Sequence, residues 1–447
     1  MQKLLSPSAN QMLPCDTALP LGTNSKCFLI FTYLVIVAGY SHAQVYRQEG
    51  KNRYTFAQTT FGYDLEYTPS GGFSYYRNAQ NQLQKIPIGN ALAPAISITG
   101  LHFWGHAEFF TTFSLPDIDL VKDATHGEYQ RFSSTGFKYF VQPVRISKLS
   151  PYIGMSLSSF SFKQANGVQM KRADGSLLGG LAYSFKKGML EIGCNYHYKN
   201  RYRYYISPTE NIPVKVPPFS VSVDYKYFFD LSLSSLKRER SGALQNEYTL
   251  LKKRKALSSI SLALGPAYSF FCKSSVYNKT YKPFLDDHRV STVYPDIGIG
   301  YYHYKLDATV NLSNRFFSST LTAYGFTQQV KRNSLALEAY KFLGDYHGFV
   351  PFVGAIASYE KFRVRETENG VETFKRTYEF ISPGFIAGWD IRPTRTDWWG
   401  VRTNIRFFPN LSLAMPGNSK MNMQQVELNF LQLILYPGRI IAVSSKK

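Results

Sequence analysis

Apolar and polar residues alternate along most of the chain after Gln44. The clearest run extends from Phe219 to Tyr227, where Phe, Val and Tyr occupy the odd positions and Ser, Asp and Lys the even ones. Successive side chains of a β-strand point to opposite faces, so this run predicts a strand with one apolar and one polar face. Strands of this kind build transmembrane β-barrels, whose outer surface meets lipid and whose interior is polar.

The same alternation predicts sixteen antiparallel strands, in an all-β, up-and-down transmembrane barrel architecture. No segment after the leader is apolar enough to form a membrane-spanning helix. The first eight strands are expected at 52–67, 93–101, 105–115, 131–142, 148–162, 173–186, 188–199 and 217–229. The second eight are expected at 256–272, 293–304, 306–316, 333–343, 349–363, 374–390, 396–408 and 425–437.

The connections between these strands alternate in length, which predicts the topology. Long, polar connections are expected at 68–92, 116–130, 163–172, 200–216, 273–292, 364–373 and 409–424, and short ones at 102–104, 143–147, 187, 305, 344–348 and 391–395. Outer-membrane barrels carry long loops outside the cell and short turns in the periplasm. If the N-terminus is periplasmic, every long connection in this set falls outside. The segment 230–255 is then the one long link on the inner side.

The first 43 residues have the pattern of a secretory signal peptide. Lys26 precedes an apolar stretch at 27–40, and Ser41-His42-Ala43 forms a small-x-small end, so we expect cleavage after Ala43. The apolar stretch is shorter than the roughly 20 residues that a spanning helix needs. The leader therefore predicts export across the inner membrane and a location in the outer membrane.

Charge and composition narrow the expected partners. The chain has 51 Lys and Arg against 30 Asp and Glu, a formal charge of +21. A basic protein attracts polyanions, and behind a secretion signal these are outer-membrane lipids and lipopolysaccharide, with small anionic solutes as a further possibility. We expect no nucleic-acid partner. The 33 Tyr and 34 Phe suit the aromatic girdles that barrels carry at both membrane interfaces.

Weak internal similarity divides the mature chain into two halves. Pro151-Tyr152-Ile153-Gly154 matches Pro351-Phe352-Val353-Gly354, and Gly100 matches Gly300. We interpret this as an internal repeat. The predicted organisation is a signal peptide at 1–43, a first eight-strand repeat at 44–235, a basic periplasmic linker at 236–255, a second repeat at 256–440 and a tail at 441–447.

These features together resemble the porin-like outer-membrane β-barrel proteins of Gram-negative bacteria. The resemblance rests on the signal, the alternation, the connection lengths and strand ends rich in aromatics, such as Tyr227-Phe228-Phe229. It covers nearly all of the mature chain at the level of the class and indicates no subfamily. It implies an integral outer-membrane protein.

The repeats can form one barrel or two. Eight strands leave an interior that side chains fill, whereas 16 leave an aqueous channel. The long basic link and glycines on the inward phase, among them Gly154 and Gly193, favour two small barrels. Tandem barrels in one chain are rare, however, and we therefore expect a single barrel of about 16 strands, with two tandem eight-stranded barrels as the alternative.

Charged residues on the inward phase are the main candidate site. Charges cannot face lipid cheaply, so they either line a pore or pair inside the lumen. These candidates are Asp64, Glu66, Glu191, His197, Asp224, Lys226, Glu338, Asp390, Arg402, Arg406 and Glu427. Arg402 and Arg406 share one face of one strand, and in an open pore they would favour anions.

A second candidate site is a basic tract with interleaved aromatics in an outer loop. Its residues are Lys199, Arg201, Tyr202, Arg203 and Tyr204, which could hold a phosphate or a sugar. His102, His106 and Glu108 could ligate a metal, but they cross a predicted tight turn, where we expect interface anchors instead. We expect no metal, no cofactor and no catalytic residues, because no nucleophile or acid pair stands beside an orienting His.

The sequence therefore predicts a passive porin-like channel for small solutes, among which the inward arginines would favour anions. The alternative is a closed barrel that serves as a structural, adhesive or partner-binding protein of the outer membrane.

Overall fold

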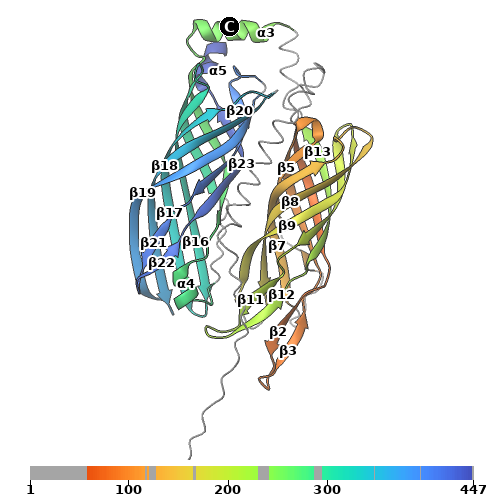
Figure 1. Cartoon of the computed structure of the whole chain (residues 1–447), viewed down its shortest axis with the longest axis vertical. Coiled ribbons are helices and arrows are strands. Elements are labelled where there is room, and N and C mark those ends of the chain that lie inside the picture. Colours follow the sequence, from red (N-terminus) through yellow and green to blue (C-terminus); the bar gives the residue numbers. More distant parts are fainter. Residues whose placement is uncertain are drawn as a thin grey trace, which may run out of the picture. The chain divides into compact units, whose positions relative to one another are not determined.

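The strands of the computed structural model pair into two rings of eight (Figure 1). The structure describes residues 58–115, 118–119, 127–164, 168–229, 241–285, 294–346, 348–392 and 394–444. The predicted signal peptide and its cleavage site lie outside these residues.

The first ring contains eight antiparallel strands in chain order. They are β1 (Gln58–Thr68), β4 (Ala91–His102), β5 (Ala107–Ser114), β7 (Glu128–Phe140), β8 (Lys148–Lys163), β9 (Met170–Phe185), β10 (Gly188–His197) and β13 (Phe219–Phe229). β13 pairs with β1, with Tyr225 opposite Tyr63, and this pairing closes the ring. The two-residue strand β6 (Ile118–Asp119) adds to β4.

The second ring is a closed barrel with the same order. Its strands are β14 (Ser259–Phe271), β15 (Tyr294–His303), β16 (Ala308–Ala323), β17 (Phe326–Phe342), β18 (Phe349–Glu368), β19 (Val371–Ile391), β20 (Trp399–Phe408) and β23 (Gln425–Leu435). β23 pairs with β14, and Leu435 lies opposite Leu262.

These pairings confirm the all-β, antiparallel fold with sixteen barrel strands and correct its closure. A single 16-stranded barrel requires β13 to pair with β14, whereas β13 pairs with β1 and β14 with β23. The alternative of two tandem eight-stranded barrels is therefore the one that the structure has. An eight-stranded ring has an interior that side chains can fill, which agrees with the crowded inward positions described below.

All sixteen predicted strands are present in the predicted order, but several are longer than expected. The predicted ends at 316 and 333 were wrong, because β16 and β17 run on to a tight turn at Tyr324-Gly325. The predicted loop at 364–373 was also wrong, since β18 and β19 meet at Asn369-Gly370. Both turns have two consecutive positive φ angles, 50° and 76° in the first and 49° and 85° in the second, which suits a two-residue hairpin.

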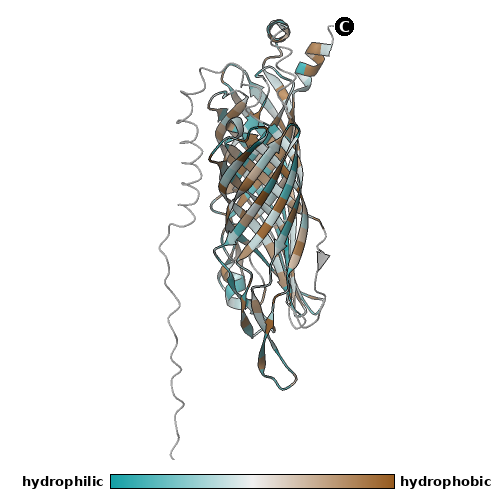
Figure 2. Ribbon diagram, turned by 90° about the vertical axis from the view of Figure 1, so that its right-hand side faces the viewer, coloured by the Kyte–Doolittle hydropathy of each residue, from teal (hydrophilic) through white to brown (hydrophobic). Residues whose placement is uncertain are grey.

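The outer surface of both rings carries the apolar half of each alternating strand. Figure 2 shows apolar and polar positions alternating along the strands. Exposed residues on the barrel walls include Ile153, Leu181, Ile192, Leu264, Ile297, Leu337 and Phe385, each more than half exposed. This is the arrangement that a lipid-facing surface requires.

We call the end of each ring with the short connections its turn end and the opposite end its loop end. At the loop end of the first ring, two predicted loops form a four-stranded surface sheet. Its strands are β2 (Phe73–Arg77), β3 (Leu83–Pro87), β11 (Arg201–Tyr205) and β12 (Asn211–Lys215), in the order β11-β12-β2-β3.

Short elements cover the ends of the second ring. Helix α4 (Val276–Tyr281) and the hairpin of β21 (Ser412–Met415) and β22 (Ser419–Asn422) lie at the loop end, as Figure 1 shows. Helices α3 (Ala243–Lys253) and α5 (Pro437–Ser444) lie at the turn end. A 3₁₀ turn, η3 (Phe103–Gly105), joins β4 to β5. Among the described residues, none of the helices has the length and apolarity that a membrane crossing needs.

The topology predicted from the connection lengths can be tested at two exposed positions. An epitope inserted after Asn81, in the β2–β3 turn, is expected to be reached by antibody on intact cells, because this turn belongs to a loop end. An epitope after Ser241, which precedes α3 at a turn end, is expected to be reached only after permeabilisation. Labelling of Ser241 but not Asn81 on intact cells would reverse the topology.

Candidate functional site

Lys226 lies at the centre of a buried charge cluster in the first ring. Its Nζ is 2.5 Å from Glu108 Oε1, 2.8 Å from Glu191 Oε1 and 3.2 Å from Asp224 Oδ2, and its side chain has no exposed surface. Lys138 pairs with Glu191 and lies 3.5 Å from Glu108. We call these five residues the lysine cluster. They come from β5, β7, β10 and β13, so the ion pairs cross the lumen rather than line it.

Arg131 organises a second cluster nearer the loop end of the same ring. Its guanidinium pairs with Glu66 and contacts the imidazole of His197. Asn195 Nδ2 donates to Glu66 Oε1 at 3.2 Å, and the Ser220 hydroxyl donates to the same oxygen. These donors lie on β7, β10 and β13, so Glu66 of β1 is bonded from several sides of the lumen and cannot face an open channel.

Small residues and tyrosine fill the space between these two clusters. Hydroxyls of Ser156 and Ser176 lie 2.6 Å apart. Tyr152 occupies the volume that two glycines leave free, since a Cβ on Gly180 or Gly193 would lie 2.6 Å or 2.3 Å from its hydroxyl. The inward glycines thus mark a crowded interior, as the sequence indicated. Asp64, a half-buried candidate, lies directly opposite Asp224 in the β1–β13 register.

Apolar clusters seal the two ends of the first lumen. The turn end holds Leu101, Phe110, Phe140, Tyr152, Leu178, Ala182 and Met189. The loop end holds Ile88, Tyr129, Phe160, Phe162, Met170, Tyr202, Tyr204, Ile212, Val214 and Val216. The second cluster places one face of the surface sheet over the lumen.

The inward face of β17 shows how the second lumen is layered. From the turn end it presents Phe342, Tyr340, Glu338, Ala336, Ser334, Arg332, Val330 and Gln328, and each of these is buried. Phe342 and Tyr340 form an aromatic layer at the turn end. Glu338 and Arg332 belong to two charged layers, and Gln328 belongs to an amide layer near the loop end. The ion pairs of the other strands join these layers at the same heights.

The first charged layer is centred on Arg406. Its guanidinium lies 2.6 Å from Glu338 Oε1 and 2.6 Å from Asp296 Oδ2. Asn311 donates to Glu338 at 3.0 Å, and Asn429 donates to Asp296 at 3.0 Å. Arg406 and both carboxylates have at most 1% of their side-chain surface exposed. The anions that Arg406 could attract in a pore are replaced here by two carboxylates of the chain itself.

The second charged layer contains two arginines on one carboxylate. Arg315 and Arg332 both pair with Glu427, and Arg332 also makes a two-pronged contact with Glu360 at 2.6 and 2.7 Å. Gln425 donates to Glu427 at 2.8 Å. A carboxylate can accept from several donors at once, so these contacts bind four strands to one another across the lumen.

Arg402 occupies the turn end of the same strand as Arg406. It makes two hydrogen bonds to Asp390, at 2.6 and 2.9 Å, and donates to the Tyr340 hydroxyl. Its guanidinium also lies over the rings of Tyr340 and Phe352, 4.7 and 5.0 Å from their centroids. Arg402 and Arg406 do share one face, as predicted, but both are paired and covered.

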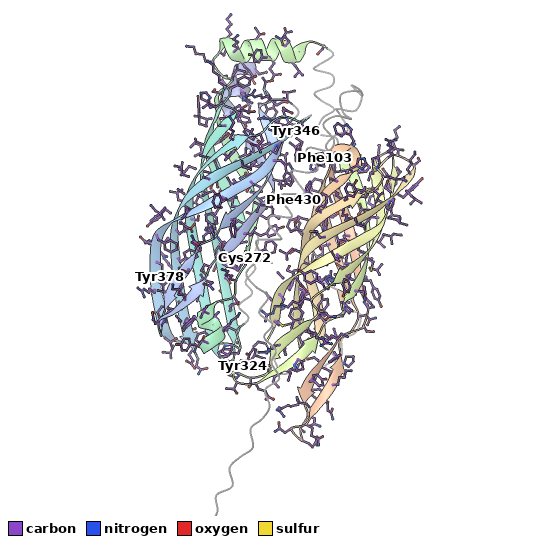
Figure 3. All side chains as sticks on the ribbon, viewed as in Figure 1. Phe103, Cys272, Tyr324, Tyr346, Tyr378 and Phe430 are labelled. Carbon is purple, nitrogen blue, oxygen red and sulfur yellow. The ribbon has the colours of Figure 1, made fainter. Side chains whose placement is uncertain are left out.

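Other elements close the ends of the second ring. At the loop end, Tyr277 of α4 donates to Glu366 at 2.8 Å, and Asn278 exchanges two hydrogen bonds of 3.0 Å with Gln328. Tyr378 of β19, labelled in Figure 3, donates to the carbonyl of Ala414 in the β21–β22 hairpin. The hairpin buries Leu413, Met415 and Met421 in the same core.

The turn end of the second ring is tied to α5 through Arg439. Its guanidinium donates to the carbonyls of Asp397 at 2.6 Å and Leu257 at 2.8 Å, and it lies 4.2 Å from the centroid of the Tyr436 ring. Arg254, which follows α3, donates to the carbonyl of Ala442 at 2.9 Å. Both helices therefore cap this end.

The structure places all eleven lumen candidates on the inner face of a ring, and ten of them are buried. It also reveals partners that the sequence had not indicated: Glu108, Arg131, Asp296, Arg315, Arg332 and Glu360. Arg315 continues the inward phase of Asn311 and Ser313, which is a signal that could have identified it. Glu108, which the sequence grouped with His102 and His106, lies in β5 and belongs to the lysine cluster.

The basic tract of the first ring is divided by its own alternation. Lys199, Arg201 and Arg203 are exposed, whereas Tyr202 and Tyr204 are 8% and 1% exposed. The expectation of two surface tyrosines was wrong, because strand β11 turns alternate residues into the apolar cluster of the loop end. Among the described residues, no group of His, Cys, Asp and Glu is arranged to hold a metal ion.

No known family model matches the chain, and no curated protein matches it. The solved structures similar to it include Neisserial surface protein A, at 16% identity and a TM-score of 0.27, covering 40% of this chain and 98% of that one. They include Ail of Yersinia pestis, at 12% identity and a TM-score of 0.26, covering 40% and 97%. They also include an outer membrane channel from Pseudomonas putida F1, at 8% identity and a TM-score of 0.21, covering 87% and 98%.

The identities and TM-scores in this set are low, so the similarity does not extend to ligands or activities. The resemblance of the sequence to outer-membrane β-barrel proteins agrees, at the level of the fold, with the two eight-stranded rings. The fold itself rests on the strand pairing described above.

Proposed function

We propose that this protein is a closed double barrel of the outer membrane that acts through the structures at its loop ends, as an adhesive or partner-binding protein. A single observation carries the proposal: in each ring, buried ion pairs and apolar layers cross the lumen from wall to wall. Arg406 is held by Glu338 and Asp296, and Lys226 by three carboxylates.

The passive channel predicted from the sequence is the second candidate. Its support is the polar character of both lumens, which water could enter if the ion pairs rearranged. Breaking such a pair leaves a buried charge uncompensated and costs about 3–5 kcal/mol, so a spontaneously open state would be rare. A closed barrel therefore explains the burial and pairing of these side chains better than an open channel does. As part of the same proposal, the signal peptide directs export of the protein, and the two barrels arose by internal duplication.

Single-channel recording tests the proposal directly. The purified, folded protein in a planar bilayer is expected to give no steady conductance, because the lumen of each ring is occupied by side chains. An open porin reconstituted in the same way is the positive control, and heat-unfolded protein is the negative one. Reproducible conductance steps from protein that migrates as folded on a gel would overturn the closed barrel and favour the channel.

A further inference from the structure

The outward face of the surface sheet concentrates positive charge. Residues 73–87 and 199–215, which contain its four strands, include six Lys and Arg and one acidic residue, Glu210. Arg77 donates to Glu210 at 2.9 Å, and this hydrogen bond lowers the pKa of the Glu210 carboxyl below its ordinary value. Glu210, the single acidic residue of the two segments, is thus paired with Arg77. The other five Lys and Arg have no carboxylate within these segments to pair with.

Strand register places several of these cations on one face. Arg201 lies opposite Lys215, and Lys215 lies opposite Phe73, so these residues form a row across three strands. Arg203 is two residues from Arg201 and shares its face. Lys85 reaches the same row from β3, because its Nζ lies 4.2 Å from the centroid of the Phe73 ring.

The opposite face of the sheet is already occupied. Tyr202, Tyr204, Ile212 and Val214 pack into the apolar cluster at the loop end of the first ring. The sheet therefore presents its cations away from the barrel, and its buried face fixes their positions. A row of fixed cations beside an aromatic ring suits an extended polyanion, because charges arranged in advance need little ordering on binding.

We propose that this face binds an acidic polysaccharide, a chain of sugars that carry carboxylate, phosphate or sulfate groups. This inference rests on the proposed function, since it names the partner class of a protein that acts at its loop ends. The buried face of the sheet packs against Phe160 and Phe162, near the loop end of β8, and against Met170 at the start of β9. β8 and β9 each have 16 residues, against the roughly 9–11 that a membrane crossing needs. A polysaccharide extends far enough from the membrane to reach the sheet, whereas the phosphates of a lipid headgroup stay at the membrane surface.

Binding of dextran sulfate, with neutral dextran as the matched uncharged probe, tests the inference. The full protein in detergent is expected to bind dextran sulfate, more weakly as salt rises, and not to bind dextran. Arg201→Glu with Arg203→Glu is expected to weaken binding roughly 25-fold, since a cation facing an anionic surface contributes about fivefold. The matched control is Lys252→Glu with Lys253→Glu, two exposed lysines in α3 at a turn end, for which we expect less than about a twofold change.

Three outcomes would overturn the inference. Equal losses in the two charge-reversed variants would show attraction to net charge alone. Undiminished binding after reversal of Arg201 and Arg203 would place the site elsewhere. Equal competition by lipopolysaccharide reduced to its lipid and innermost sugars would assign the face to the membrane's own lipid. If the Glu pair does not migrate as folded, Arg201→Gln with Arg203→Gln replaces it. Conductance is measured separately, so failure of the closed barrel is distinguishable from failure of this site.

Discussion

Replacing Arg406 with methionine is expected to lower the free energy of unfolding of the second barrel by about 3–5 kcal/mol, the usual cost of removing one partner of a buried ion pair. Methionine keeps most of the side-chain volume and removes the charge. Glu338 and Asp296 then lose the guanidinium that contacts them both. Urea unfolding in lipid vesicles measures the loss. A Trp104→Phe background leaves Trp389, Trp398 and Trp399, all in or beside strands of the second barrel, as the fluorescent reporters.

The matched control is Arg365→Met. Arg365 lies 2.8 Å from Glu372, in an ion pair whose side chains are 54% and 38% exposed. Exposed pairs contribute about 0–1 kcal/mol, so this variant is expected to unfold almost as the parent does. Equal losses in the two variants would show that the lumen pair contributes no more than a surface pair. Unchanged stability of Arg406→Met together with a new conductance would instead place Arg406 in a pore wall.

The positions of the strands could be predicted because each strand carries its own signal. In an eight-stranded barrel the inner and outer faces meet opposite environments along the whole strand, so period-two alternation persists from end to end. β17 illustrates this with nine buried positions at alternate residues between Phe326 and Phe342. The ends were less accurate, because the alternation of β16 and β17 continues past the expected loop to Tyr324-Gly325.

Ring closure could not be predicted from the same signal. Whether β13 pairs with β1 or with β14 changes no residue pattern inside β13, since both neighbours would present the same two faces. The signal that could have predicted the closure was the size of the inward residues, because it shows how much space the lumen leaves for side chains. Glycines such as Gly193, which leaves room for Tyr152, fit only a narrow interior. Their number on the inward phase argued for two small rings and was outweighed by the rarity of tandem barrels.

The sequence predicted that the charged candidate residues lie inside the barrel wall, but it did not predict which residues they pair with. The alternation placed Lys226 and Glu191 inside, but their partner Glu108 was grouped with His102 and His106 as a metal candidate and not with the inward charges. Arg332 was missed because its segment was expected to be a loop. Ion pairs across a lumen join strands that are far apart in sequence. Spacing along the chain therefore carries no trace of them.

The lysine cluster allows the strongest test in the first barrel. Lys226→Met removes the cation that lies within 3.2 Å of three carboxylates, and Lys138 is the cation left in the cluster. We expect the first barrel to lose about 3–5 kcal/mol of unfolding free energy, measured by far-UV circular dichroism during urea unfolding. Lys85→Met, which removes a lysine from the surface sheet, is the control and is expected to cost less than about 1 kcal/mol.

Rescue distinguishes an ion pair from simple packing. Adding Glu108→Gln to Lys226→Met removes the carboxylate closest to Lys226, and replacing both partners of a buried pair costs far less than replacing one. The double variant is therefore expected to regain more than half of the lost stability. Because the pairs of the two lumens share no residue, Lys226→Met and Arg406→Met are expected to act additively, within about 0.5 kcal/mol. A double variant at Lys226 and Glu108 that is less stable than Lys226→Met alone would show that Glu108 is held by other groups and that Lys226 does not neutralise it.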